Sequence, residues 1–290
     1  MSFSILPISS FLLILLLSFP STPPSLPLTF VYLKQIDPSI LQDIRYAKSY
    51  NILGRPLKGI YVDECVLTRK AAEMLSKVQK EVEKFSNFTQ KNFTLKVLDC
   101  YRPKIANEDL SYSIMQGKIW KKENFAPDLD GLKLIKGGFI DGNHGFARGS
   151  TVSVTLSNYK LNYFYFDRDQ VENVYCYSDY NRRWWFDFGI DMGTNYDCFD
   201  QTSFFNASNN YLHSSNRKLL KVLMENHGFI KKNELNWWEF VLEDEPYSDM
   251  EFDFPVKSFD NVKKEKNISY MILYSNDKKS FSQIYFESPT

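Results

Sequence analysis

Two short segments hold the residues whose side chains are best suited to chemistry. In Asp-Cys-Tyr-Arg-Pro (residues 99–103), Arg102 carries a planar, permanently charged guanidinium that can bind a carboxylate through two hydrogen bonds. In Asn-Trp-Trp-Glu (residues 236–239), the Glu239 carboxylate could coordinate a metal ion, whereas the Asn236 amide cannot accept a proton near neutral pH. The chemistry that these side chains suit is binding of a peptide or another anion.

Further motifs accompany these two segments along the chain. They are Arg-Tyr-Ala (45–47), Gly-Arg-Pro (54–56), Arg-Gly-Ser-Thr-Val-Ser-Val-Thr-Leu (148–156), Asp-Met-Gly-Thr (191–194) with Asp197, Met-Glu-Asn (224–226), Gly-Phe (228–229), Asp-Glu-Pro-Tyr (244–247) and Phe-Asp-Phe-Pro (252–255). In type and order the motifs resemble those of the zinc D-alanyl-D-alanine dipeptidases of the VanX type, over residues 40–257. The resemblance implies an α+β fold in which a small antiparallel sheet is flanked by helices.

The resemblance also implies where a zinc site should lie. In that family Gly-His-Ser-Arg-Gly-Ser-Thr-Val-Asp-Leu-Thr-Leu supplies two zinc ligands, and Glu-Trp-Trp-His supplies the general base and a third ligand. Aligned without gaps, this chain has Phe146, Ser153 and Glu239 at the ligand positions and Asn236 at the base. A catalytic zinc site usually needs three protein ligands and a water whose proton a base removes. We therefore expect no zinc or other cofactor, and no hydrolysis by the family mechanism.

His144, two residues before Phe146, is the candidate for rescuing the metal site. On an extended strand that spacing shifts a side chain by about 6.6 Å, whereas zinc–nitrogen bonds are ~2.0–2.1 Å long. His144 and Glu239 could hold a metal ion together only if the loop were rebuilt. The other histidines, His213 and His227, are expected just before and at the end of a helix, away from the Trp-Trp motif.

Arg102, Glu239, Ser153 and Asn236 form the ligand-binding site that the resemblance implies. The family uses the arginine of its Tyr-Arg-Pro motif to stabilise the developing oxyanion of the scissile amide. Here Arg102 either binds a ligand, such as a small peptide or a D-amino-acid dipeptide, or pairs with a carboxylate such as Glu239. A buried guanidinium without any anion nearby would be costly.

Helices and antiparallel strands are expected to position these residues, which gives an α+β class. Apolar residues recur at helical spacing after Thr68, a predicted helix cap, and alternate with Thr and Ser around residue 153. Gly228 is expected to end the last helix. We predict helices of about seventeen residues after Thr68, at 104–121 and at 216–227, and strands at 95–98, 150–156 and 237–242.

Four residues near the motifs are interpreted as structural. Trp237 and Trp238 are expected to form core and pocket wall rather than a carbohydrate platform. Asp191 and Asp197 lie in a loop motif that looks structural in the family.

The first thirty residues differ from the rest of the chain. The apolar run Phe11 to Phe19 is too short for a bilayer core of ~30 Å, which needs about 20 residues, and prolines follow it. We predict a signal peptide at residues 1–28, a secreted or secretory-lumen protein, and no membrane span after cleavage. The dipeptidase-like domain is predicted at 29–257, with an insertion at about 159–188, and a polar tail at 258–290.

Four cysteines and four glycosylation sequons agree with secretion. Three disulfide pairings are possible. We prefer Cys65–Cys100 with Cys176–Cys198, because each pair joins neighbours in sequence. The sequons lie at Asn87, Asn92, Asn206 and Asn267.

The charge balance argues against nucleic-acid binding, and three functions remain open. Lysine plus arginine and aspartate plus glutamate both number 35, and no basic block marks a nucleic-acid-binding surface. The favoured function is a secreted pseudoenzyme that binds a small peptide or cell-wall fragment. The alternatives are an active zinc metallodipeptidase with a rearranged site that uses His144 and Glu239, and a purely structural glycoprotein.

Overall fold

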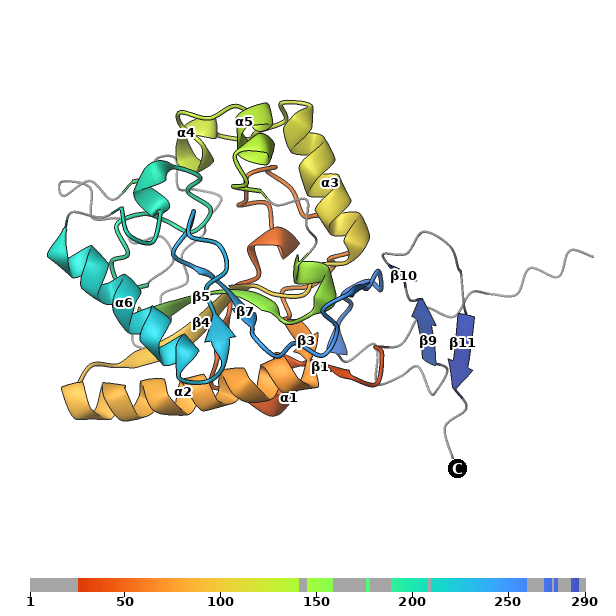
Figure 1. The fold of residues 1–290 in the computed structure, drawn as a ribbon, viewed down its shortest axis with the longest axis horizontal. Helices are drawn as coiled ribbons and strands as arrows, with labels where there is room; N and C mark the ends of the chain where they lie inside the picture. Colours follow the sequence, from red (N-terminus) through yellow and green to blue (C-terminus); the bar gives the residue numbers. More distant parts are fainter. Residues whose placement is uncertain are drawn as a thin grey trace, which may run out of the picture.

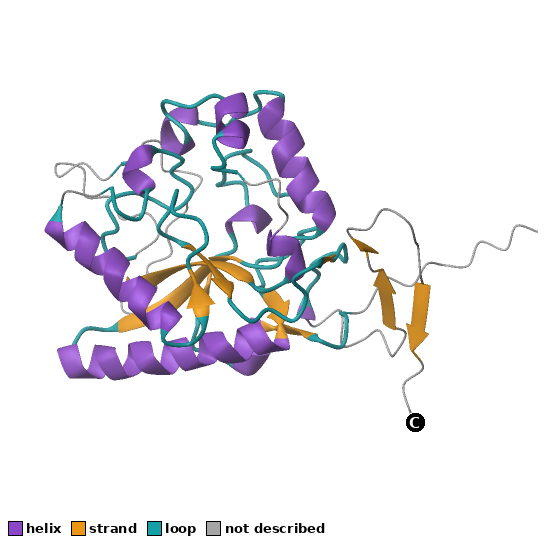
Figure 2. Cartoon of the chain, in the orientation of Figure 1, coloured by secondary structure: helices purple, strands orange, loops and turns teal. Residues whose placement is uncertain are grey.

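A five-stranded sheet with the order β2-β4-β5-β7-β6 lies at the centre of the molecule (Figure 2). Its strands are β2 (Leu41–Gln42), β4 (Phe93–Asp99), β5 (Thr151–Asn158), β7 (Glu239–Leu242) and β6 (Phe229–Ile230). Neighbouring strands are antiparallel except β2, which pairs with β4 in parallel. The predicted α+β class is confirmed, and the parallel edge strand is a feature that the sequence did not reveal.

The computed structural model describes residues 26–140, 145–158, 176–177, 189–207, 210–259, 269–272, 274–275 and 283–286. Most of the predicted leader and insertion therefore lies outside the described residues, as do His144 and Asn267. No helix in the described part of the chain is both long and apolar enough to cross a membrane.

A bulge in β4 determines which face of the sheet carries Asp99. From Phe93 to Val97 the strand pairs regularly with β5, and Val97 lies opposite Val154. The register then shifts by one residue, so Asp99 lies opposite Ser153. An extra residue in one strand re-aims the side chains that follow it. Asp99 and Ser153 consequently share one face of the sheet, which is the face that carries the candidate site.

Helix α2 (Arg69–Thr89) packs along β4 on the other face of the sheet (Figure 1). The Thr68 hydroxyl accepts a hydrogen bond from the backbone N–H of Ala71 at 3.3 Å, so the predicted cap is confirmed. The helix is 21 residues long rather than about seventeen. It continues until Gln90, whose left-handed φ of 55° closes it.

The remaining helices differ from the prediction mainly at their ends. Helix α3 (Lys104–Met115) stops before residue 121 because Gly117 adopts a left-handed φ of 71°. Two short helices, α4 (Lys122–Phe125) and α5 (Gly131–Lys136), follow in a stretch for which the sequence patterns predict no helix or strand. Helix α6 (Tyr211–Glu225) begins earlier than predicted, since the Asn210 side chain caps it. Gly228 follows its end with a φ of 79°, as expected.

Short elements complete the fold. They are β1 (Phe30–Tyr32), α1 (Leu33–Ile36), β3 (Val66–Thr68), β8 (Met250–Glu251), β9 (Ser269–Ile272), β10 (Tyr274–Ser275), β11 (Gln283–Phe286) and the 3-10 helices η1 (Arg45–Ala47), η2 (Gly145–Arg148) and η5 (Gln201–Ser203). Strand β10 pairs with β8, and β11 pairs with β9. The segment predicted as a polar tail therefore contains strands.

The preferred cysteine pairing is confirmed. Cys65 and Cys100 form one disulfide and Cys176 and Cys198 the other, with Cα–Cα separations of 5.9 and 4.9 Å. The first disulfide joins the chain before β3 to the residue that follows β4, close to Arg102. Three of the sequon asparagines, Asn87, Asn92 and Asn206, are exposed.

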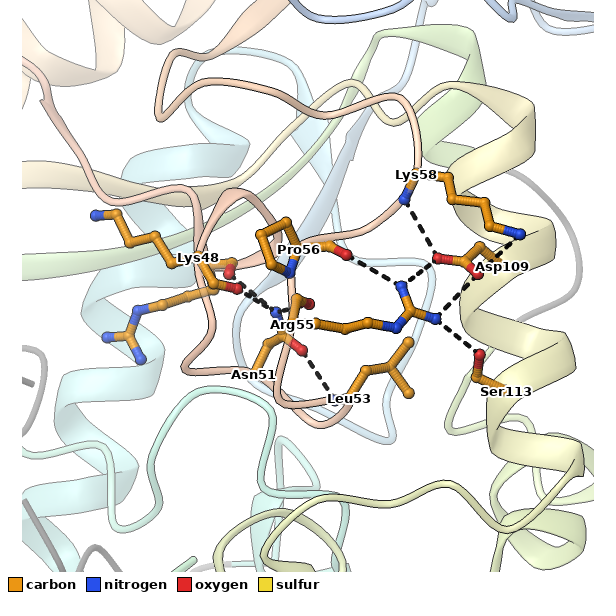
Figure 3. Close-up of polar contacts among 9 residues, drawn as sticks. Lys48, Asn51, Leu53, Arg55, Pro56, Lys58, Asp109 and Ser113 are labelled. Atoms are coloured by element: carbon orange, nitrogen blue, oxygen red, sulfur yellow. Dashed lines mark hydrogen bonds and ion pairs between the residues drawn. The ribbon is translucent and has the colours of Figure 1, made fainter. Parts of the chain in front are cut away.

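A polar cluster ties the loop at residues 51–58 to helix α3 (Figure 3). The Arg55 guanidinium donates to both carboxylate oxygens of Asp109 at 2.7 and 3.0 Å and to the Ser113 hydroxyl at 3.1 Å. The Asn51 side chain bridges the loop by donating to the Lys48 and Arg55 carbonyls. This cluster holds in place the helix that forms one wall of the candidate site.

Candidate functional site

A cavity of about 630 Å³ opens on the face of the sheet opposite α2. This volume lies within the range of roughly 300–1,000 Å³ that small-molecule sites span. Strands β5 and β7 form its floor with Ser153 and Glu239, which lie opposite each other in register. Helix α3 contributes Asn107 to the wall, and Arg102 faces the cavity from the turn between β4 and α3. The cavity brings together all five predicted site residues, namely Arg102, Phe146, Ser153, Asn236 and Glu239.

Arg102 is buried, and its partner is Asp99 rather than the predicted alternative Glu239. The Arg102 Nε lies 2.8 Å from Asp99 Oδ2, an ion pair whose angle falls short of a hydrogen bond. The guanidinium also packs against the rings of Phe146 and Tyr46, with its Cζ 3.9 and 4.9 Å from the ring centroids. No described residue accepts a hydrogen bond from its two terminal nitrogens. Arg102 therefore has unused donors at the cavity wall.

Two buried carboxyl groups surround this guanidinium. Burial raises the pKa of Asp99 to about 7, against the opposing effect of Arg102. Burial also raises the pKa of Asp197 to about 6, although Tyr46 donates a hydrogen bond to it and Arg102 lies nearby. Asp197 has a left-handed φ of 60°, which aspartate tolerates better than most residues. The charge of this part of the cavity thus changes between about pH 5 and 8.

Phe146 fills the position at which the motif of the resembled family has a histidine. It lies in η2, is buried, and stacks on the Arg102 guanidinium. The backbone joins the same two residues, because the Arg102 N–H donates to the Phe146 carbonyl at 3.3 Å. The ring is part of the support of Arg102 and offers no lone pair to a metal ion.

Asn236 holds Glu239 in place. Its side-chain oxygen accepts from the Glu239 backbone N–H at 2.9 Å, and its amide nitrogen lies 3.5 Å from Glu239 Oε2. Lys231 donates to the same Asn236 oxygen and to the Glu239 carbonyl, both at 3.3 Å. Burial lowers the pKa of Lys231 to about 8. The residue at the general-base position is therefore a turn-forming amide with its oxygen already bonded.

The described residues do not fit a zinc ion. They contain no group of three or more His, Cys, Asp and Glu side chains that could hold a metal. Of the three ligand positions, Phe146 has no donor, and Ser153 has a neutral hydroxyl. His144 lies outside the described residues. His213 lies within α6 rather than just before it, and its ring is 2.9 Å from Asp191 Oδ2. His227 follows the end of α6, as expected, and its ring contacts Glu81.

The structural interpretation holds for three of the four residues near the motifs. Trp237 is buried and donates to Thr194 Oγ1 at 2.9 Å, and Trp238 lines the cavity. Asp191 accepts the Gly193 N–H at 2.8 Å in its loop. Asp197, in contrast, lies in the cavity wall.

Sequence reasoning missed several residues of the cavity. Asp99 could have been found, since it precedes Arg102 by three residues within one motif. Tyr46, Asn107 and Asp197 come from separate elements, and no local signal links them to Arg102.

Comparisons with known proteins agree with the order of the motifs. A family model, Peptidase_M15, described as D-ala-D-ala dipeptidase, matches residues 188–257. A D-alanyl-D-alanine dipeptidase from Enterococcus faecium is 30% identical over 230 residues, which cover 79% of this chain and 98% of that protein. Proteins of the same name from Enterococcus faecalis and Streptomyces coelicolor are 26% and 24% identical, each over 78% of this chain and 98% of their own length. The chain therefore belongs to the D-alanyl-D-alanine dipeptidase family, whose members are zinc-dependent.

Proposed function

We propose that this chain is a secreted pseudoenzyme of the dipeptidase family that binds a small peptide or cell-wall fragment through its carboxylate. The observation that carries the proposal is Arg102, a buried guanidinium whose terminal nitrogens have no hydrogen-bond partner among the described residues and which faces a cavity of about 630 Å³. A guanidinium binds a carboxylate through two parallel hydrogen bonds. The ligand carboxylate would occupy the cavity in front of Arg102.

The donor set supports the absence of hydrolysis. Phe146 and Asn236 replace a metal ligand and the general base, and losing a general base alone costs roughly 10²–10⁴ in rate. Secretion is supported by the leader sequence, the two disulfides and the three exposed sequons. A purely structural glycoprotein is disfavoured, because a cavity lined by both Arg102 and Glu239 has not filled in.

The second candidate function is an active metallodipeptidase with a rearranged site. It is favoured by one observation: Glu239, which can bind a metal ion, lies on the cavity floor beside Ser153. His144 would be its partner. In that case the Glu239→Ala variant would lose hydrolysis, and the wild type would hold zinc.

The test uses the full secreted chain and combines metal analysis with two assays. We expect less than one zinc per ten chains, no release of D-alanine from D-Ala-D-Ala, and calorimetric binding of the intact dipeptide. Binding should weaken at least thirtyfold in Arg102→Met and remain unchanged in Arg69→Met, a control on the exposed face of α2. One tightly bound zinc per chain together with turnover would overturn the proposal, as would equal binding by wild type and Arg102→Met.

A further inference from the structure

The Glu239 carboxylate stands on the cavity floor at the position where the family motif has a histidine. We propose that Glu239 binds an ammonium group of the ligand, so that the cavity selects molecules that carry a primary amine as well as a carboxylate. The inference rests on the proposed function, since it assigns the opposite end of the ligand that Arg102 holds. It gives the replaced metal position a binding role of its own.

The geometry provides acceptors for an ammonium group. Ser153 lies opposite Glu239 in the β5–β7 register, so its hydroxyl and the carboxylate share one face of the sheet. Both line the cavity, and Ser153 is only 1% exposed. An ammonium has three donors and needs several acceptors when it leaves water. A carboxylate beside a hydroxyl meets part of that need.

The carboxylate is also oriented before any ligand arrives. The Asn236 side chain binds the Glu239 backbone N–H at 2.9 Å and lies 3.5 Å from Oε2. Asn236 is itself 4% exposed and is held by Lys231. A binding group fixed by such supporting contacts loses less conformational entropy when its ligand binds.

The charges of the cavity favour a cation near Glu239. Two further carboxyl groups lie in this region, namely Asp99, on the other side of Ser153, and Asp197, which lines the same cavity. Lys231 is the buried cation behind Glu239, and burial lowers its pKa to about 8. Arg148 also lines the cavity, but Glu245 pairs with it at 3.0 Å. Lys232 lies at the exposed rim. A positive ligand group would relieve the repulsion among the carboxylates.

Aromatic side chains add to this preference. Trp238 lines the cavity next to Glu239 in sequence and packs edge-on against Tyr196, another lining residue, with ring centroids 5.4 Å apart. The π faces of Trp and Tyr attract cations within about 6 Å. Carboxylates combined with aromatic rings are suited to binding an organic cation, whereas Arg102 is suited to binding the carboxylate of the same ligand.

Calorimetry with two probes tests the assignment. The probes are D-Ala-D-Ala and N-acetyl-D-Ala-D-Ala, which keeps the carboxylate but has no ammonium. Wild type should bind the acetylated probe at least tenfold more weakly, and Glu239→Gln, whose amide keeps the shape of the side chain, should bind both probes with equal affinity. Glu73→Gln, on the exposed face of α2, is the matched control and should retain the tenfold preference. Asp197→Asn is measured beside it to test the other carboxyl group of the cavity wall. Thermal unfolding of each variant checks that it is folded.

The outcomes separate this inference from the proposed function. Absence of binding of either probe by wild type overturns both. Equal binding of the two probes by wild type, or a preference that persists in Glu239→Gln, overturns the role of Glu239 and leaves carboxylate binding by Arg102 standing. A preference lost in Asp197→Asn but kept in Glu239→Gln moves the ammonium site to Asp197 and also overturns the inference.

Discussion

Arg102 and Arg217 are both buried arginines, 9% and 1% exposed, but their donors meet different partners. Arg217, in α6, donates to the carbonyls of Met192, Phe204 and Thr202 at 2.8, 2.6 and 2.9 Å. Its donors are used to join α6 to the loops around η5. Arg102 forms an ion pair with Asp99 and packs against two aromatic rings, and its terminal nitrogens remain available at a cavity.

The hydrogen-bond partners of the two guanidinium groups distinguish a structural arginine, Arg217, from a ligand-binding one, Arg102. Backbone carbonyls satisfy the donors of Arg217 in the folded chain, so this arginine needs no ligand. Burial lowers its pKa to about 10. Around Arg102 the protein supplies charge balance through Asp99 and flat surfaces through Phe146 and Tyr46, but few hydrogen-bond acceptors. A buried guanidinium arranged in this way is suited to accept a carboxylate from outside.

The largest expected effect is that of Arg217→Met on stability. Three hydrogen bonds from a charged donor are lost and three backbone carbonyls lose their partner, so the free energy of unfolding should fall by about 3–4 kcal/mol. Chemical denaturation measures it. Arg102→Met should lower it by less, because Asp99 can be neutralised by protonation. A larger loss in Arg102→Met than in Arg217→Met would break the comparison.

A smaller effect is expected from pH. The raised pKa values of Asp99 and Asp197, about 7 and 6, mean that both carboxyls lose protons between about pH 5 and 8. The added negative charge competes with a ligand carboxylate for Arg102. Affinity for N-acetyl-D-Ala-D-Ala, which has a carboxylate but no ammonium group, should therefore be about three- to fivefold higher at pH 5.5 than at pH 7 when measured by calorimetry. Asp99→Asn should flatten this dependence, and a higher affinity at pH 7 would contradict it.

The raised pKa values of Asp99 and Asp197 also predict that the free energy of unfolding falls as pH rises. A carboxyl whose pKa is raised on folding contributes stability below its unfolded pKa of about 4, and that contribution is lost as pH rises through the folded value. For Asp99 and Asp197 the loss falls between about pH 4 and 7. The difference in free energy of unfolding between Asp99→Asn and wild type, followed over this window, isolates the contribution of Asp99.

The smallest effect is expected at Arg55, an arginine paired within the protein at the surface. Its pair with Asp109 has ideal two-bond geometry, but its side chain is 42% exposed. Arg55→Ala should lower the free energy of unfolding by about 1 kcal/mol. Ligand affinity should stay within twofold of wild type, because the cluster supports α3 without lining the cavity. A tenfold loss of affinity would show that α3 positions the ligand directly.

Much of the fold could be predicted because local rules act on it directly. The Thr68 cap, the alternation along β5 and Gly228 after α6 each depend on a few neighbouring residues. The end of α3 and the start of α6 were misplaced, since Gly117 and the Asn210 cap lie where apolar spacing gives no boundary. The parallel strand β2 is two residues long and carries no periodic signal.

The candidate site was predictable to the extent that motifs carry it. Arg102, Phe146, Ser153, Asn236 and Glu239 meet in one cavity, as their motifs implied. The contact between Phe146 and Arg102 was not foreseen, because it joins residues 44 positions apart. The partner of Arg102 was also left open, and it depends on the strand register rather than on residue type.

The bulge in β4 lets the strand hold one residue more than regular pairing with β5 would allow. With regular pairing, Asp99 would lie opposite Val152 instead of Ser153 and would face α2. Deleting Leu98 would remove the extra residue and leave Asp99 opposite Ser153 in a regular strand, still on the cavity face. The number of paired residues between Val97 and Arg102, rather than the number in the sequence, thus decides whether the arginine and its counter-ion reach the same side of the sheet.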